Sequence, residues 1–197
     1  MLKLRYIENL YISLVFLMCV NTLYASPEVY GVDLNIMKII REQFYIAVDN
    51  EDTTASLMNF IRQEFSNDCN FYPPVILAYY ASLEGLRAKH ALNPLKKLKF
   101  VKNAISKMEE AVERQPNSLE IRFLRFAFYH QIPWIFGLHD KVKEDRIAVI
   151  KLLEKRDYSS VSRELQKYVI LYMLEKNRVN KEQKTRLEKI YNEMNKE

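Results

Sequence analysis

The residues with the greatest chemical capability lie between positions 120 and 136 (EIRFLRFAFYHQIPWIF). Arg122 and Arg125 are three residues apart, so in a helix they lie next to each other on one face. Two guanidinium groups so placed can hold a carboxylate or stack on aromatic rings, which are abundant in this segment. One interpretation is therefore a groove for a partner segment or a small anion, with Arg122, Arg125, His130 and Trp134 as its binding residues.

A second interpretation assigns the same residues to the interior. Arginines in an aromatic core must be paired with carboxylates, because a buried unpaired charge is costly. Glu84 and Asp145 are candidate partners of Arg122 and Arg125. We favour this interpretation over the groove, although both make residues 120–136 the first place to look.

Other chemistry finds little support. The 3 glycines stand alone, which excludes a glycine-rich phosphate loop. The 3 histidines are scattered and no CxxC occurs, so we expect no metal site and no cofactor. No nucleophile elbow or zinc-protease motif is present. Glu109 and Glu110 lie beside a basic helix face and are interpreted as solvated charges, so no catalytic residue is assigned and the protein is predicted not to be an enzyme.

The positive charge is mild, with a net value of +5. Such an excess does not indicate nucleic-acid binding, which usually concentrates charge more strongly. A basic run lies on a helix whose opposite face carries Leu98, Val101 and Ile105, so we interpret it as a solvated face that permits at most a weak association with a membrane surface. The run consists of Lys96, Lys97, Lys99, Lys102 and Lys107.

The N-terminus has the features of an export signal. A short basic start precedes an apolar run at residues 10–20, and Ala25 offers a small residue for cleavage. We predict a signal peptide at residues 1–25 and a periplasmic location. Retention as an uncleaved anchor is the main alternative, and lipidation at Cys19 is less favoured. Cleavage would leave Cys69 as the one cysteine, so no internal disulfide is expected.

Helical periodicity dominates the chain after the predicted signal peptide. Short connections between helices favour antiparallel neighbours. We therefore predict an all-α fold: one domain over residues 26–197, with about eight helices in antiparallel hairpins and no sheet. Helix starts are expected at Asp52–Thr54, Pro73–Pro74, Asn93–Pro94, Asn117 with Glu120, Asp140, Ser159–Ser160, and Asn180 with Gln183.

Two resemblances accompany this prediction. The spacing Ala104-x3-Met108-x2-Ala111-x4-Pro116 resembles the second helix of a tetratricopeptide repeat, in which small residues allow close helix packing. Residues 79–145 also resemble uncharacterised exported helical proteins of Gram-negative bacteria, through AKH at 88–90, NPLKK at 93–97, PN at 116–117, EIRFLR at 120–125 and Pro133. The resemblances imply a tetratricopeptide-like bundle or solenoid and a compartment, but no activity.

Two functions are compatible with these observations. The first is a non-enzymatic module that binds another envelope protein, because stacked helical hairpins present an extended surface. The second is a helical bundle that encloses a lipid or another apolar ligand, since the aromatic residues near Trp134 could line a cavity.

Overall fold

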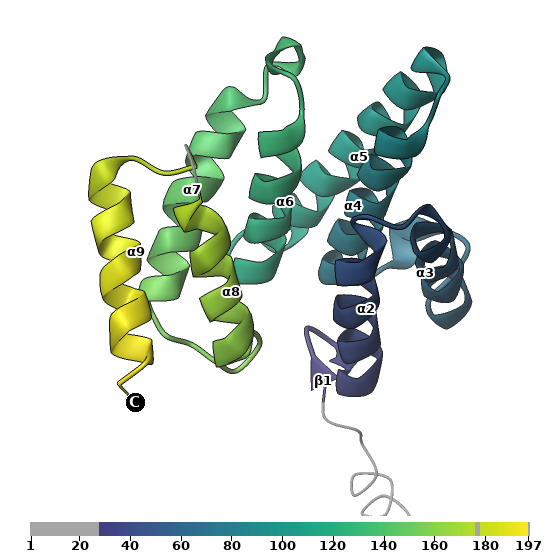
Figure 1. Ribbon diagram of the computed structural model, residues 1–197. Coiled ribbons are helices and arrows are strands. Elements are labelled where there is room, and N and C mark those ends of the chain that lie inside the picture. Colours follow the sequence, from purple (N-terminus) through teal and green to yellow (C-terminus); the bar gives the residue numbers. More distant parts are fainter. Residues whose placement is uncertain (1–27, 176–177, 197) are drawn as a thin grey trace, which may run out of the picture.

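The structure is a computed structural model that describes residues 28–175 and 178–196, so the predicted signal peptide lies outside the described residues. It confirms the all-α prediction, with eight α-helices in these two ranges (Figure 1). The helices are α2 (Leu34–Ala47), α3 (Glu51–Glu64), α4 (Pro74–His90), α5 (Pro94–Arg114), α6 (Leu119–Gln131), α7 (His139–Glu154), α8 (Arg163–Leu174) and α9 (Lys181–Met194). None of these helices is long and apolar enough to cross a membrane.

A small β-hairpin, which the sequence did not predict, precedes the first of these helices. Strand β1 (Glu28–Val29) pairs antiparallel with β2 (Val32–Asp33). Tyr30 and Gly31 form the turn with φ values of 57° and 73°. Positive φ at both central residues matches the twist of a two-residue hairpin turn. Asp33 then accepts hydrogen bonds from the first amides of α2, so the hairpin leads directly into the helix.

The helices pair along the chain as α2/α3, α4/α5, α6/α7 and α8/α9 (Figure 1). The first helices α2, α4 and α6 also pack against one another, and α8 reaches α6 through aromatic contacts. Figure 1 shows the pairs following one another from α2/α3 to α8/α9. The predicted antiparallel hairpins are therefore present.

Helix α4 is the central element and is buried on nearly every side. An amphipathic helix buries one face, but residues on every side of the first half of α4 are buried, because α2, α3, α5 and α6 all contact this helix. Gly85 lies where α4 meets α6, and a Cβ at this position would overlap the ring of Phe128. The glycine therefore permits the close approach of these two helices.

The helix starts were predicted correctly where proline or a capping box marked them. Asn93 caps α5, and its side chain accepts from the amides of Leu95 and Lys96. Asn180 and Gln183 form the predicted capping box of α9. Pro74 occupies the first turn of α4, where its missing N–H costs nothing.

Four other predicted starts were displaced by one to three residues. Ser118 rather than Asn117 caps α6, and its Oγ accepts from Ile121. Glu120 does not complete a capping box because its carboxylate is held by other helices. The remaining caps are Asn50 for α3, Leu138 for α7 and Ser162 for α8, in place of Asp52–Thr54, Asp140 and Ser159–Ser160.

Candidate functional site

Arg122 and Arg125 extend from α6 toward α7 and share one carboxylate, Asp145. Arg125 donates from Nε to Oδ2 at 2.7 Å and from Nη2 to Oδ1 at 2.8 Å, and Arg122 Nη1 lies 2.9 Å from Oδ1. Arg125 and Asp145 are 1% and 0% exposed. For these two arginines the pairing expected in the interior interpretation is therefore confirmed, with Asp145 as the partner. Glu84 is not a partner of either arginine. Its Oε1 lies 3.6 Å from Nη1 of Arg87 instead.

Glu109 on α5 extends this network and is not the solvated charge that the sequence suggested. Its carboxylate accepts from Arg125 Nη1 at 3.1 Å, from the Tyr129 hydroxyl at 2.7 Å and from Lys141 Nζ at 3.0 Å. Burial would raise the pKa of Glu109, but the hydrogen bonds of Tyr129 and Lys141 and the charge of Arg125 bring it below its ordinary value. Three helices, α5, α6 and α7, are thus joined by one set of charges.

The same network leaves the arginine pair little capacity for an external ligand. Arg122 also donates from Nε to the Pro116 carbonyl at 2.7 Å and from Nη1 to Glu144 at 2.6 Å. All three guanidinium nitrogens of Arg125 donate hydrogen bonds to carboxylates of α5 and α7. In this conformation the two residues position helices and do not present a free carboxylate-binding fork.

A second buried network joins α2, α4 and α6 and was missed from the sequence. Arg41 donates from Nε and Nη2 to the two oxygens of Glu120 at 2.8 and 2.6 Å, a bidentate pair. Tyr79 donates to Oε1 of the same carboxylate at 2.6 Å. Arg41 Nη2 also reaches the Ser160 carbonyl at 3.1 Å. The only sequence signal was an arginine three residues before Phe44, on the apolar stripe of its helix.

His130 lies near the end of α6, stacked on Phe126 with 5.8 Å between ring centroids. Burial lowers the pKa of His130 below its ordinary value, and the nearby charges of Arg178 and Arg146 lower it further. Arg178 is paired with Glu175, whereas the Nε of Arg146 is buried without a hydrogen-bond partner among the described residues. This environment favours the neutral imidazole.

We expect the pKa of His130, followed by NMR, to lie below the ordinary value of about 6.5. Because the pKa is lowered in the folded state, the stabilisation from the neutral imidazole is present above about pH 6.5 and is lost as the pH falls through the folded value. The His130→Gln variant should therefore lose less stability than the wild type between about pH 7 and pH 5. The Arg146→Gln variant should raise the pKa of His130, and a wild-type pKa at or above the ordinary value would contradict this account.

Trp134 lies far out on the short 3₁₀ segment η2 (Trp134–Phe136), in the turn between α6 and α7. Trp134 and Ile135 are 91% and 74% exposed. Trp134 does not line an enclosed apolar cavity, so this part of the sequence-based expectation was wrong. The predicted site residues therefore occupy three separate places: the arginine network, the His130 environment and an exposed turn.

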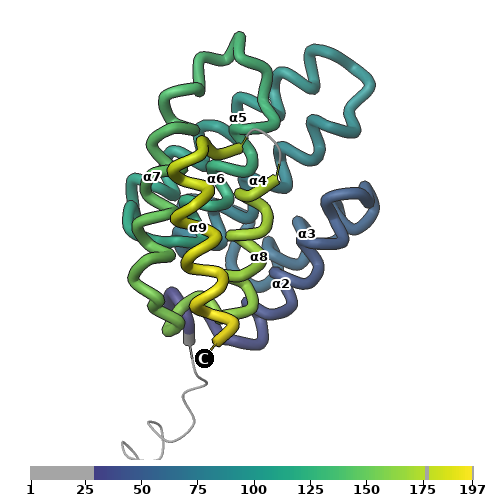
Figure 2. The backbone as a smooth tube through the Cα atoms, turned by 60° about the vertical axis from the view of Figure 1, so that its left-hand side comes forward, coloured from purple at the N-terminus to yellow at the C-terminus, as the bar shows by residue number. Residues whose placement is uncertain are grey.

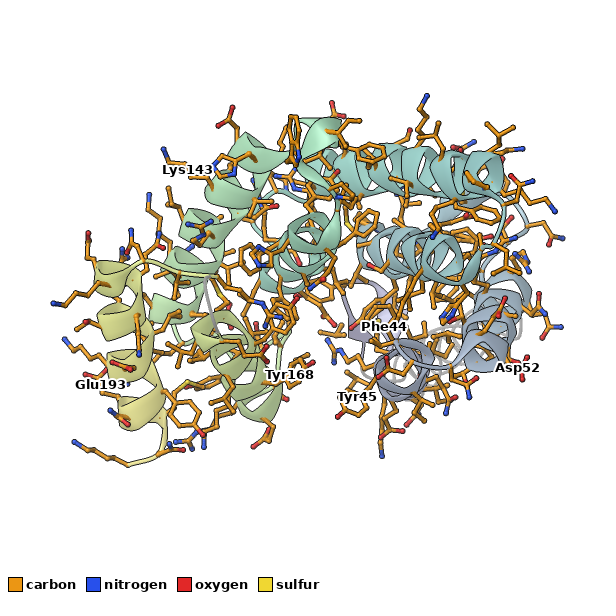
Figure 3. All side chains as sticks on the ribbon, turned by 45° about the horizontal axis from the view of Figure 1, so that its top comes forward. Phe44, Tyr45, Asp52, Lys143, Tyr168 and Glu193 are labelled. Carbon is orange, nitrogen blue, oxygen red and sulfur yellow. The ribbon has the colours of Figure 1, made fainter. Side chains whose placement is uncertain are left out.

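The inner side of the helix array presents a surface that the sequence did not single out. Tyr45 of α2 and Tyr168 of α8 extend toward each other from the two ends of the array (Figure 3), with 6.4 Å between ring centroids. Their exposed fractions are 70% and 45%, and Leu171 beside Tyr168 is also exposed. Behind them, Phe44 packs edge-on against Tyr79, and Phe123 of α6 packs against Tyr168. We call Tyr45, Tyr168 and Leu171 the inner aromatic surface.

The comparisons with known proteins add no assignment to this geometry. No family model, no curated protein and no solved structure matches the chain. Within residues 28–175 and 178–196, no three His, Cys, Asp or Glu side chains are grouped so that they could hold a metal ion. The arrangement itself offers exposed aromatic and aliphatic area backed by a rigid layer of rings.

Proposed function

We propose that this protein is an exported, non-enzymatic interaction module, tetratricopeptide-like in architecture, that binds a segment of another envelope protein. The binding surface in this proposal is the inner aromatic surface. The observation that supports it most directly is the exposure of Tyr45 and Tyr168 on facing helices.

The physical support comes from the properties of tyrosine. A tyrosine ring offers a large apolar area with few rotatable bonds and a hydroxyl that forms hydrogen bonds, which is why tyrosine is enriched in protein interfaces. Tyr168 is held by the ring of Phe123, at 6.3 Å between centroids. A surface held in place in this way loses less conformational entropy on binding than one built from flexible side chains.

The export part of the proposal depends on residues 1–25 and stays a prediction from the sequence. The alternative function, a bundle that encloses an apolar ligand, also stays a prediction. It now lacks the cavity at Trp134 on which it was based, because that side chain is exposed.

Site-specific photo-crosslinking in intact cells tests the proposed surface. A photoreactive phenylalanine analogue is placed at Tyr45, at Tyr168 or at Asp52, which is exposed and lies away from the inner side (Figure 3). We expect one protein to be crosslinked from both tyrosine positions and not from Asp52. Substituting the opposite tyrosine with alanine should weaken the crosslink by about ten-fold, the loss typical of an aromatic contact at the centre of an interface.

The control for this experiment is the folded state of each variant. Because Tyr45 is 70% exposed, Tyr45→Ala should keep the wild-type unfolding midpoint. Tyr168→Ala loses the contact with the ring of Phe123, so it should unfold at a slightly lower temperature but still in one cooperative transition. Equal crosslinking from all three positions, or the same products after alanine substitution, would contradict the proposed surface.

A further inference from the structure

Two turns at one end of the molecule expose large apolar side chains. Leu92 and Leu95, at the turn between α4 and α5, are 99% and 78% exposed, and Trp134 and Ile135 occupy the turn between α6 and α7. Figures 1 and 2 differ by a rotation about the vertical axis, and both turns lie at the top in each. One flat surface can therefore touch both turns. We call these four residues the apolar tips.

The α4–α5 tip is surrounded by positive charge. Residues 91–108 contain no Asp or Glu, and Lys96, Lys97, Lys99 and Lys102 are all exposed there. Just before the turn, Arg87 lies over the ring of Phe100, 4.2 Å from its centroid. The tip therefore combines exposed leucines with lysines that have no acidic neighbour in sequence.

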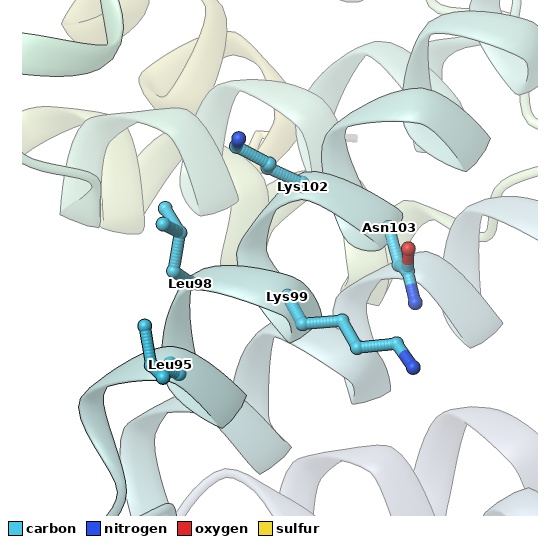
Figure 4. Close-up of a pocket in the computed structure, with 5 residues that line it drawn as sticks. All are labelled: Leu95, Leu98, Lys99, Lys102 and Asn103. Atoms are coloured by element: carbon cyan, nitrogen blue, oxygen red, sulfur yellow. The ribbon is translucent and has the colours of Figure 1, made fainter.

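The first turns of α5 differ from what the sequence suggested. Leu98 was expected to lie on a buried face with the lysines on the opposite, solvated face, but it is 40% exposed. Leu95, Leu98, Lys99, Lys102 and Asn103 line a shallow depression (Figure 4). Apolar groups and ammonium groups are thus side by side on one accessible surface.

This combination identifies the kind of partner. Lysine is depleted from protein–protein interfaces, which argues against a protein or a second copy of this chain as the cover. Tryptophan favours the boundary between water and lipid, and lysines near a membrane are attracted to anionic headgroups. A bilayer is also flat, so it can meet both turns at the same time.

We propose that the apolar tips insert into the interfacial region of an anionic lipid bilayer, while the lysines at the start of α5 contact its headgroups. This docking is independent of the inner aromatic surface. It places α4, α5, α6 and α7 end-on against the membrane and leaves the opposite ends of these helices facing water.

The chain contains 1 tryptophan, so its fluorescence reports the α6–α7 tip directly. The protein purified from cells that express the full chain is mixed with phosphatidylcholine vesicles, with or without phosphatidylglycerol. We expect the emission of Trp134 to shift to shorter wavelength, and to be quenched by brominated lipid, only with the anionic vesicles. The partition coefficient should fall as salt is raised, because salt screens the lysine–headgroup attraction. Because Trp134 lies in the turn between α6 and α7, its emission reports insertion of this tip and does not respond to attachment through the N-terminal apolar run.

Substitutions test the two parts of the surface separately. Leu92→Asp with Leu95→Asp should weaken binding by more than about ten-fold, since two apolar side chains are replaced by anions. Each Lys→Gln change at Lys96 or Lys97 should weaken binding by about five-fold. Phe71→Asp is the matched control, since Phe71 is 76% exposed but precedes α4 at the opposite end of that helix, and it should bind like the wild type.

Three results would overturn the proposal. The first is unchanged Trp134 emission with anionic vesicles under conditions in which the protein sediments with them, since another surface would then be in contact. The second is equal binding by the Leu92/Leu95 variant and the wild type. The third is a blue-shifted emission that depends on protein concentration without lipid, which would show that a second copy covers the tips.

Discussion

Replacing Asp145 with alanine is expected to lower the free energy of unfolding by about 3–5 kcal/mol, the range for breaking a buried ion pair by removing one partner. The cost arises because the buried positive charge of Arg125 loses its main partner. Arg125 is 1% exposed and donates two hydrogen bonds to this carboxylate, while Arg122 donates a third. Without Asp145, the buried guanidinium group of Arg125 keeps its ion pairs with the partly exposed carboxylates of Glu109 and Glu144 and its position over the ring of Tyr129.

Urea unfolding followed by circular dichroism measures this effect. Glu144→Ala is the control because Glu144 also contacts both arginines but is 48% exposed, so its loss should cost no more than about 1 kcal/mol. The double variant Arg125→Met/Asp145→Leu should recover a large part of the lost stability, since an apolar pair of similar volume needs no compensating charge. A cost for Asp145→Ala no larger than that for Glu144→Ala would show that Arg125 finds other partners.

Replacing Glu120 with alanine is expected to cost about 3 kcal/mol and to loosen α2 in particular. The Glu120 carboxylate is 3% exposed and receives Arg41 in a bidentate pair and the hydroxyl of Tyr79. Burial and the charge of Glu120 raise the pKa of Tyr79, so the tyrosine remains a neutral donor. Without this carboxylate, the buried hydroxyl of Tyr79 loses its acceptor, and the partly buried Arg41 keeps its contact with the Ser160 carbonyl.

Hydrogen exchange resolved by residue distinguishes a local from a global effect. We expect faster exchange in α2 and the preceding hairpin, with little change in α9, which does not contact this network. Tyr79→Phe serves as the control, because it removes one hydroxyl while the ring still packs against Phe44 at 5.1 Å, and it should cost about 1 kcal/mol. Uniform acceleration in all helices would mean that Glu120 supports the fold as a whole and not the attachment of α2.

The helical fold was predictable because its signals are local. Apolar spacing of three and four, proline in a first turn and a capping box are all properties of neighbouring residues. Where such a signal was weak, the predicted start was displaced, as at Asn117. Helix α4 is buried on more than one face because four other helices contact it, and no local pattern encodes those contacts.

The sites were predictable only in part, because the residues that form them are far apart in the sequence. The pairing of Arg122 and Arg125 with Asp145 could be expected because buried arginines require carboxylates and few acidic residues follow nearby. The Arg41–Glu120 pair spans 79 residues, and nothing in the spacing of either residue indicates the other. The exposure of Trp134 and Leu98 depends on how far two turns extend beyond their neighbours, which is a property of the assembled molecule.

The bond between Arg41 and Glu120 has a consequence for cooperativity. In a simple repeat array each hairpin contacts only its neighbours, so terminal repeats can open one at a time. Here a side chain of the first hairpin is anchored in the third, and the Ser160 carbonyl just before the fourth is attached to the same guanidinium group. The first hairpin therefore cannot detach without exposing a buried carboxylate between α4 and α6. The array should consequently unfold in one all-or-none step and should not tolerate truncation by a whole hairpin from its N-terminal side.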